Sequence, residues 1–460
     1  MADSAPSGSG GPFQVTGQAR EGSLLISGGA GGISVQLEEL AAGARKLDDL
    51  AAMLGAVEAE MHRIWEDLGG YRNEPWPTGT AALSSVWEAK GSVQAARAGL
   101  QHVSGQIRAC VRDYETAEWW ADVGRFTGYL SLADLQDTQS NIATTGVLDR
   151  RAMEWLVSQA GMEHAVLKQG MAGGPAQANL GSLLGAFTPR PLELRQEETV
   201  PVDLDSSPTG LLERIRAIDA RGAGFIEVIE VDNGGQPSYV VVVPGTQAAG
   251  VQAGGSNPFD EAGIIEGLFH GSAEVNAGVL AALKAAGAEK GVPVVAVGYS
   301  QGGIHAMNLA ADPRLLKEYE LRYVLTAGSP VAGIIPEGGI DSLHLEHVTD
   351  GVTGTDGEPN PATRDRVTVS LSHSLRTGEG GILGDGHALT NYQEGARLVS
   401  ASADPSLVHS TAVLAGVLGP GGAATATRFS LSRQETPEAP RGRARDRRGP
   451  FTPRPQHGAR

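Results

Sequence analysis

Apolar residues recur every three or four positions over two long N-terminal stretches of this chain. The first stretch covers residues 33–68 and the second covers residues 86–114. Such spacing places the apolar side chains on one face of a helix that packs lengthwise against another helix. Residues 73–79, Asn-Glu-Pro-Trp-Pro-Thr-Gly, separate the two stretches and are rich in helix breakers. The pattern predicts an antiparallel helical hairpin.

From about residue 209 onward, short apolar runs alternate with helical patterns. Helices are predicted at 211–216 and 273–286. Strands that follow one another with helices between them imply a mainly parallel sheet with right-handed crossovers. We therefore expect an α/β domain whose strands are predicted at 225–231, 239–243, 294–297, 322–326, 343–348 and 366–370.

Composition sets the limits of these regions. Both ends of the chain are poor in large apolar residues, and the C-terminal end also carries seven arginines after residue 440. Such segments are typical of disorder. We expect five regions: disorder over 1–30, a helical hairpin over 31–130, a helical connector and linker over 131–200, the α/β domain over 201–418, and a disordered Arg-rich tail over 419–460.

Charge and composition also exclude several classes of function. The formal net charge of −17 argues against nucleic acid as the main partner. A single cysteine excludes an intramolecular disulfide. No apolar run reaches the ~18 residues of a membrane span, and residues 1–11 lack the features of a signal peptide. We expect no transmembrane segment, no metal site and no cofactor, since no metal-ligand cluster or phosphate-binding loop is evident.

The strongest chemical signal is Gly298-Tyr299-Ser300-Gln301-Gly302, which joins a predicted strand to a predicted helix. In a Gly-x-Ser-x-Gly turn between a strand and a helix, the serine is exposed at the strand's carboxyl end, where it can act as a nucleophile. A chance match is the alternative in a chain with 64 glycines. The strand before the turn and the helix after it favour Ser300 as a catalytic nucleophile.

A serine nucleophile needs a base, and the base needs an acid that orients it. In α/β-hydrolases the order along the chain is serine, acid, histidine. Asp350 follows the predicted strand at 343–348 and is the favoured acid. Its rivals are nearby aspartates, each of which could equally be a solvated loop carboxylate: Asp341, Asp356 and Asp365.

The base must be a histidine that follows the acid. His387 lies in a glycine-flanked loop directly before a predicted helix, which suits a base that reaches over Ser300. His373 follows a predicted strand and is the main rival. His409 falls in a predicted closing helix and His457 in the Arg-rich tail.

Two backbone N–H groups are needed to bind the oxyanion. Gln301, directly after the nucleophile, is expected to supply one of them. The loop after the predicted strand at 239–243 is expected to supply the other, from Thr246 or Gln247, because Gly245 permits close approach of the backbone.

Several of these segments resemble actinobacterial α/β-hydrolases of the lipase, esterase and cutinase-like kind. The resemblance covers roughly residues 225–400 and rests on residues 239–247, 298–303 and 326–330, and on His387 with Tyr392. Gly-Tyr-Ser-Gln-Gly is also the cutinase elbow, and Val-x-x-Pro-Gly-Thr recurs in hydrolases of the PE-PPE type. The resemblance implies a Ser300–Asp350–His387 triad, Gln301 as an oxyanion donor, and an ester or lipid-like substrate.

The predicted hairpin resembles the WXG family of type VII secretion substrates. Trp76 and Gly79 lie in its turn, and Tyr114 with Glu118 matches the family's Tyr-x-x-x-Asp/Glu signal. The chain departs from the family because two residues separate Trp76 from Gly79. The resemblance implies contact with secretion machinery or self-association, and either a cytoplasmic location or export by a type VII-like route. The alternatives are an ordinary docking hairpin and, for the whole chain, a secretion-linked interaction protein with a vestigial hydrolase domain.

Overall fold

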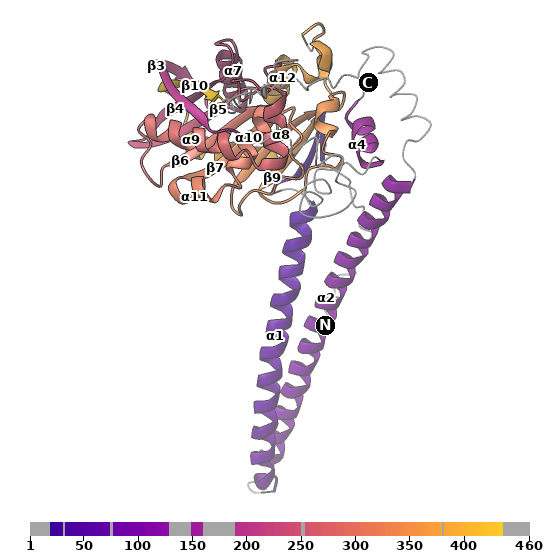
Figure 1. Ribbon diagram of the computed structural model, residues 1–460. Helices are drawn as coiled ribbons and strands as arrows, with labels where there is room; N and C mark the ends of the chain where they lie inside the picture. The colour runs from indigo at the N-terminus through magenta and orange to yellow at the C-terminus, as the bar shows by residue number, and fades with distance from the viewer. Residues whose placement is uncertain are drawn as a thin grey trace, which may run out of the picture.

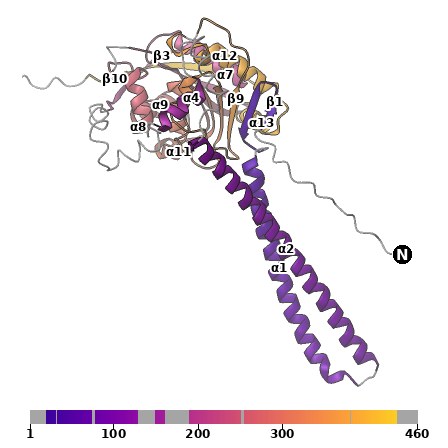
Figure 2. The same ribbon diagram turned by 90° about the vertical axis from the view of Figure 1, so that its right-hand side faces the viewer.

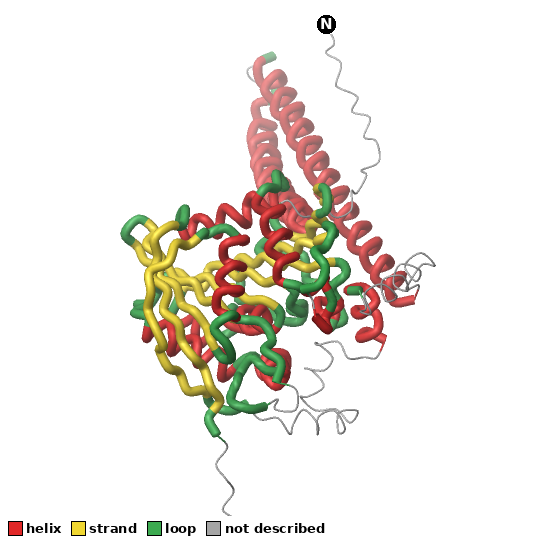
Figure 3. Tube along the Cα trace, turned by 90° about the horizontal axis from the view of Figure 1, so that it is seen from above, coloured by secondary structure: helices red, strands yellow, loops and turns green. Residues whose placement is uncertain are grey.

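The computed structural model describes residues 19–30, 33–73, 77–127, 149–159, 189–249, 254–379 and 381–435. A long helical hairpin projects from a mixed α/β body (Figures 1 and 2). The body is built on one large sheet, whose strands are drawn in yellow among the red helices in Figure 3. This architecture confirms the α/β class and the N-terminal helical region that the sequence predicts.

The hairpin consists of α1 (Ile33–Leu68), the short η1 (Gly69–Tyr71) and α2 (Thr78–Thr127). Ser104 of α2 is buried and its hydroxyl donates to the Ala44 carbonyl of α1 at 3.2 Å. Small residues at this crossing let the two helices approach closely. No helix within the described ranges combines the length and the apolar character that a membrane crossing requires.

The residues that carry the secretion-substrate resemblance are only partly described. Trp76 lies outside the described residues, and the side chains of Tyr114 and Glu118 are not described. Gly79 lies in the first turn of α2, where an added Cβ would come within 2.0 Å of the Tyr71 carbonyl oxygen. The glycine therefore permits the close turn between the two helices.

Ten strands form the sheet in the order β1-β2-β9-β8-β7-β6-β5-β4-β10-β3. The five central strands, from β5 to β9, run parallel, and the outer strands pair antiparallel. The carboxyl ends of the parallel strands therefore meet at one edge. The strands are β1 (Ala19–Glu21), β2 (Leu24–Gly28), β3 (Leu192–Leu204), β4 (Phe225–Asn233), β5 (Gln236–Val243), β6 (Pro293–Tyr299), β7 (Glu320–Ala327), β8 (Asp341–His347), β9 (Arg366–Leu371) and β10 (Gly422–Arg433).

Helices cover both faces of the sheet. One face carries α7 (Pro208–Asp219), α12 (Leu389–Ser400) and α13 (Pro405–Leu418). The other face carries α8 (Glu261–His270), α9 (Ala273–Ala285), α10 (Gln301–Leu309) and α11 (Pro313–Glu318). A further helix, α4 (Arg150–Gln159), packs beside the carboxyl end of β8.

The central strands are apolar on both faces because both faces are covered. On β6, Val295 and Val297 belong to the core beneath α7 and α12, whereas Val294 and Ala296 belong to the core beneath α9 and α10. All four side chains are fully buried. A continuous apolar run in the sequence is thus one strand shared by two cores.

Two predicted boundaries on the N-terminal side are wrong. Residues 24–28, expected to be disordered, form β2, which pairs with β9 and buries Leu24 and Ile26. Residues 192–200, expected to belong to a linker, form most of the edge strand β3, which runs to residue 204. Composition was misleading there because this edge strand only partly buries about every second residue and is mostly polar or charged between them.

The predicted start of the C-terminal tail is also wrong. Residues 422–433 form β10, which lies between β4 and β3 inside the sheet. Its buried positions include small residues such as Ala424 and Ala426, so its apolar alternation is weak in the sequence. Phe429 and Leu431 complete the core on the opposite face. The α/β body therefore extends through β10, and the Arg-rich part of the tail, from residue 436 onward, lies outside the described residues.

Candidate active site

Ser300 lies at the sharp turn between β6 and α10, at the carboxyl edge of the parallel strands. Its backbone has φ 54° and ψ −126°, which is a strained conformation for a residue other than glycine. The turn is fastened by two hydrogen bonds: the Ser300 N–H donates to the Ala327 carbonyl of β7 at 2.8 Å, and the Gly303 N–H donates to the Ser300 carbonyl at 3.0 Å. The strain is therefore held by neighbouring backbone.

Glycines on either side of Ser300 let three backbone segments meet. A Cβ on Gly298 would lie 2.2 Å from the Gly302 carbonyl oxygen. A Cβ on Gly302 would lie 2.3 Å from the carbonyl oxygen of Pro244, in the loop after β5. Since real Cβ atoms do not approach backbone this closely, side chains at these positions would push α10 away from β6 and from the β5 loop.

The structure brings Ser300, His387 and Asp350 into one hydrogen-bonded row. His387 Nε2 lies 3.0 Å from Ser300 Oγ, and His387 Nδ1 lies 2.8 Å from Asp350 Oδ2. The three residues are 4%, 4% and 0% exposed, in the order serine, histidine, aspartate. In this geometry the imidazole can accept a proton from the hydroxyl while the carboxylate holds the opposite ring nitrogen.

Local sequence explains where the carboxylate lies. β8 ends at His347, and Asp350 caps the short η4 (Gly351–Gly354), where its Oδ1 accepts from the Val352 N–H at 2.9 Å. This Asx turn leaves Oδ2 directed at His387. Aspartate is a preferred capping residue at the start of a helical turn. Because β8 is parallel to β6, Asp350 lies at the same sheet edge as Ser300.

His387 ends the short η6 (Asp385–His387), directly before α12. Asn391, which is 1% exposed in the first turn of α12, is hydrogen-bonded to the loop that leads to His387. The Asn391 side chain accepts from the Arg376 N–H at 2.8 Å and donates to the Asp385 carbonyl at 2.8 Å. The base is therefore held by a helix start and a closed loop.

The rival aspartates lie elsewhere. Asp341 begins β8, at the amino edge of the sheet, opposite Ser300. Asp356 is buried and its Oδ2 accepts from the Ala332 N–H at 2.9 Å. Asp365 precedes β9, and its carbonyl accepts from the Ser342 N–H at 2.7 Å, again at the amino edge.

The rival histidines are not placed beside Ser300 either. His373 offers its carbonyl to His347 Nε2, at 3.0 Å. His409 lies on α13 and acts electrostatically on Asp341, at the opposite edge. His457 lies outside the described residues.

The predicted oxyanion donors receive different placements. Gln301 is the first residue of α10, where an N–H has no partner within the helix and the dipole favours negative charge. The Gln247 N–H, in contrast, already donates to the Phe259 carbonyl at 2.7 Å, so the prediction of Gln247 as a donor is wrong. Thr246, half-buried in the same loop, remains the second predicted donor.

The Gln301 side chain is anchored away from the nucleophile. With its amide nitrogen facing the Phe259 and Asp260 carbonyls, its oxygen accepts from His305 Nε2 at 3.2 Å. His305 Nδ1 in turn lies 2.7 Å from Ser272 Oγ. Burial lowers the pKa of His305 to about 3, so this second Ser–His pair contains a very weak base and no carboxylate.

Two tyrosines next to the triad were not predicted as site residues. The Tyr299 ring stacks on the His387 ring with centroids 5.1 Å apart, and its hydroxyl donates to the His387 carbonyl. The Tyr392 hydroxyl donates to Asp350 Oδ2 at 2.6 Å. Tyr299 is the variable residue of the Gly-x-Ser-x-Gly turn, and Tyr392 entered the sequence analysis only as part of the hydrolase resemblance, so neither was assigned a role.

Helix α4 supports the loop that carries Asp350. The Arg150 N–H donates to the Val348 carbonyl at 3.2 Å, and its guanidinium Nη1 lies 2.6 Å from Glu346 Oε2 of β8. Gly354, at the end of η4, lies so close that a Cβ would come within 2.3 Å of the Arg150 carbonyl oxygen. A segment far upstream in the sequence thus packs directly behind the candidate acid.

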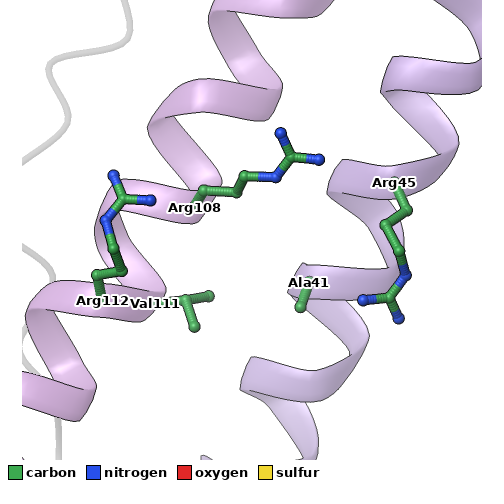
Figure 4. A pocket seen from close by; sticks show the side chains of 5 residues that line it. All are labelled: Ala41, Arg45, Arg108, Val111 and Arg112. Atoms are coloured by element: carbon green, nitrogen blue, oxygen red, sulfur yellow. The ribbon is translucent and has the colours of Figure 1, made fainter.

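Two other features of the described residues do not add to this site. They contain no group of three or more metal-binding side chains that could hold a metal ion. A pocket between α1 and α2 is lined by Ala41, Arg45, Arg108, Val111 and Arg112 (Figure 4). Arg108 pairs with Asp48 across the hairpin, and the pocket contains no triad residue.

Comparison of this chain with models of protein families, with curated proteins and with solved structures finds no match. A function for this chain is therefore inferred from the geometry of its site.

Proposed function

We propose that this chain is a serine hydrolase of carboxylic esters with an α/β-hydrolase fold. The observation that carries the proposal is the buried row from Ser300 Oγ through the His387 ring to Asp350 Oδ2. The strained turn at the carboxyl end of β6 adds support, since it presents the hydroxyl beside a helix N-terminus.

In the proposed reaction, Ser300 Oγ attacks the acyl carbon and its proton passes to His387 Nε2. Asp350 holds the imidazole in the required tautomer and stabilises the imidazolium. The N–H groups of Gln301 and Thr246 bind the oxyanion of the tetrahedral intermediate. When the intermediate collapses, the alcohol leaves with the proton from His387. Water then attacks the acyl-enzyme by the same route, and the acid is released.

A secretion-linked interaction protein is the second candidate. It is favoured by the hairpin, which projects from the body (Figure 1) and exposes apolar side chains such as Met53 at 66% and Trp87 at 59%. In that case the triad would be vestigial and chemically silent. The two candidates therefore differ in whether Ser300 reacts.

Labelling with a fluorophosphonate probe, followed by peptide mapping, tests the proposal. We expect covalent labelling at Ser300 and none in Ser300→Ala. Ser272→Ala is a matched control because Ser272 is also buried, has a positive φ of 55° and contacts a histidine. It should label like the wild type, since His305 is too weak a base. A wild-type protein that folds but does not label at Ser300 refutes the proposal. If Ser300 does label, hydrolysis of p-nitrophenyl esters of increasing acyl length measures the chain-length preference.

A further inference from the structure

Tyr392 lies in the chain segment that carries His387 and contacts Asp350, which comes from another segment. It is fully buried in the first turn of α12, five residues after His387. Its hydroxyl donates to Asp350 Oδ2 at 2.6 Å, and the same oxygen contacts His387 Nδ1 at 2.8 Å. The hydroxyl accepts from the His347 N–H at 3.2 Å, so its own proton must be directed at Asp350.

We propose that Tyr392 is a positioning residue of the triad, which fixes the Asp350 carboxylate and weakens its attraction for the His387 proton. The inference rests on the proposed function, because it assigns Tyr392 a role in that reaction. Tyr392 would touch neither the substrate nor the reacting atoms.

Tyr392 fixes the position of the carboxylate through its place in the chain. His387 and Tyr392 belong to one continuous segment, whereas Asp350 comes from the end of β8. Two hydrogen bonds to a single oxygen fix both its distance from that segment and its direction. Gly328, with φ +62°, leaves room for the ring, since a Cβ there would lie 2.9 Å from Tyr392 Cε2. The site is shaped around this side chain.

Tyr392 also acts on the charge of Asp350. The carboxylate is 0% exposed, and its three donors are Tyr392, His387 and the Val352 N–H. A buried carboxylate needs such donors to offset the loss of its hydration. Burial and the neighbouring Asp350 charge raise the pKa of Tyr392 well above its ordinary value, so the hydroxyl keeps its proton. The hydrogen bond from Tyr392 thereby neutralises part of the charge on Asp350 Oδ2, and the carboxylate attracts the imidazolium less.

Other ionisable groups surround the same pair. Tyr299 of β6 stacks on His387, while His347 and Glu346 lie on β8 near Asp350. Asp219 of α7 acts electrostatically on Tyr299. All four side chains stay in place when Tyr392 alone is substituted, and the His347 N–H loses its acceptor together with the hydroxyl.

The test is Tyr392→Phe, assayed by p-nitrophenyl ester hydrolysis across pH. Without the hydroxyl, more of the Asp350 charge acts on the imidazolium, which is the form of the base that cannot accept a proton from Ser300. We expect the acid limb of kcat/KM to move up by roughly half to one pH unit. We also expect kcat to fall by about tenfold at unchanged KM, because the carboxylate is no longer held in place by the Tyr392 hydroxyl. In an Asp350→Asn background, Tyr392→Phe should cause no further loss.

Tyr323→Phe is the matched control. Tyr323 is also fully buried, and its hydroxyl lies 2.6 Å from Ser410 Oγ, away from the triad. This variant loses a comparable hydrogen bond and should keep the wild-type pH profile. If Tyr392→Phe behaves like Tyr323→Phe, or if its effect persists unchanged in Asp350→Asn, the proposal is wrong.

Two outcomes outside this comparison are also decisive. If Tyr392→Phe does not fold, proton NMR of the wild type replaces it. A slowly exchanging Tyr392 hydroxyl proton that shifts in Asp350→Asn supports the proposal, and one insensitive to that substitution overturns it. Failure of wild-type Ser300 to label with fluorophosphonate removes the proposed function itself, and that failure is seen before any tyrosine is changed.

Discussion

Replacing Arg150 with methionine should destabilise the protein more at high pH than at low pH. Arg150 begins α4 and its side chain is 14% exposed, beside the 4% exposed side chain of Glu346. Its Nη1 lies 2.6 Å from Glu346 Oε2, and the same nitrogen donates to Ser370 Oγ at 2.8 Å. The substitution removes a buried cation while the carboxylate stays in place.

The magnitude follows from the titration of Glu346. Burial raises its pKa from 4.5 to about 7, against the opposing charge of Arg150. Between these values the folded state binds the proton more tightly than the unfolded state does. The contribution of Glu346 to wild-type stability therefore falls as pH rises through this interval, by about 3 kcal/mol in total, and levels off above it.

In Arg150→Met, loss of the nearby charge raises the pKa of Glu346 further. The decline in stability then continues past the point at which the wild type levels off. At about pH 8 this adds about 1 to 2 kcal/mol of destabilisation, whereas at about pH 5.5 it adds close to none. The lost hydrogen bonds to Ser370 and to Glu154, whose Oε1 lies 2.8 Å from Arg150 Nε, contribute about 1 kcal/mol each at both pH values.

Urea denaturation at the two pH values measures these free energies of unfolding. Arg151→Met is the control, because Arg151 is the next residue on α4 and is exposed. It should stay near wild type at both pH values. In a Glu346→Gln background, the difference between the two pH values should shrink to the part that comes from Asp356, which also feels the Arg150 charge. An equal loss at the two pH values in the otherwise wild-type chain would falsify the assignment to Glu346.

Three further outcomes are expected. Asp350→Asn should lower kcat by roughly 10⁴ through the wrong histidine tautomer, whereas Asp341→Asn, at the opposite sheet edge, should hydrolyse esters like the wild type; equal losses would contradict the assigned acid. Gly302→Ala should abolish fluorophosphonate labelling, since its Cβ would meet two carbonyl oxygens within 2.4 Å, and normal labelling would refute this steric reasoning. Replacing residues 56–96 with a short Gly-Ser turn should leave ester turnover intact, whereas deleting residues 1–188 should give an insoluble or inactive chain, because the deletion removes β2 and α4. Circular dichroism and p-nitrophenyl acetate turnover are measured on both variants. An inactive hairpin variant or an active deletion variant would contradict this division of the chain.

The last expectation differs from what the sequence alone suggests. From the pattern of elements, a chain that begins near residue 200 should fold and hydrolyse short esters. The structure contradicts that division in three places: β3 begins at Leu192, β2 covers the edge of β9, and α4 packs behind the Asp350 loop. The helical hairpin is thus inserted between two segments that both belong to the α/β body.

The features that depend on local chemistry could be predicted from the sequence. The strand before Ser300, the glycines around it and the helix after it are contiguous, so their pattern predicts a strained turn without knowledge of anything distant. The strand-end position of Asp350 and the loop position of His387 follow from the same local periodicities. These three residues were named from the sequence, and the structure places them within hydrogen-bond distance.

The remaining features required the tertiary structure, because they depend on which distant segments lie together. Gln247 cannot be an oxyanion donor because its N–H already donates to the Phe259 carbonyl. Tyr392 contacts Asp350, which lies 42 residues away in the sequence. The edge strand β3 and the small-residue strand β10 contain too few large apolar residues to show the alternating apolar pattern of a strand in the sequence. Each becomes a strand because the other, or β4, supplies the hydrogen-bond partners that its backbone requires.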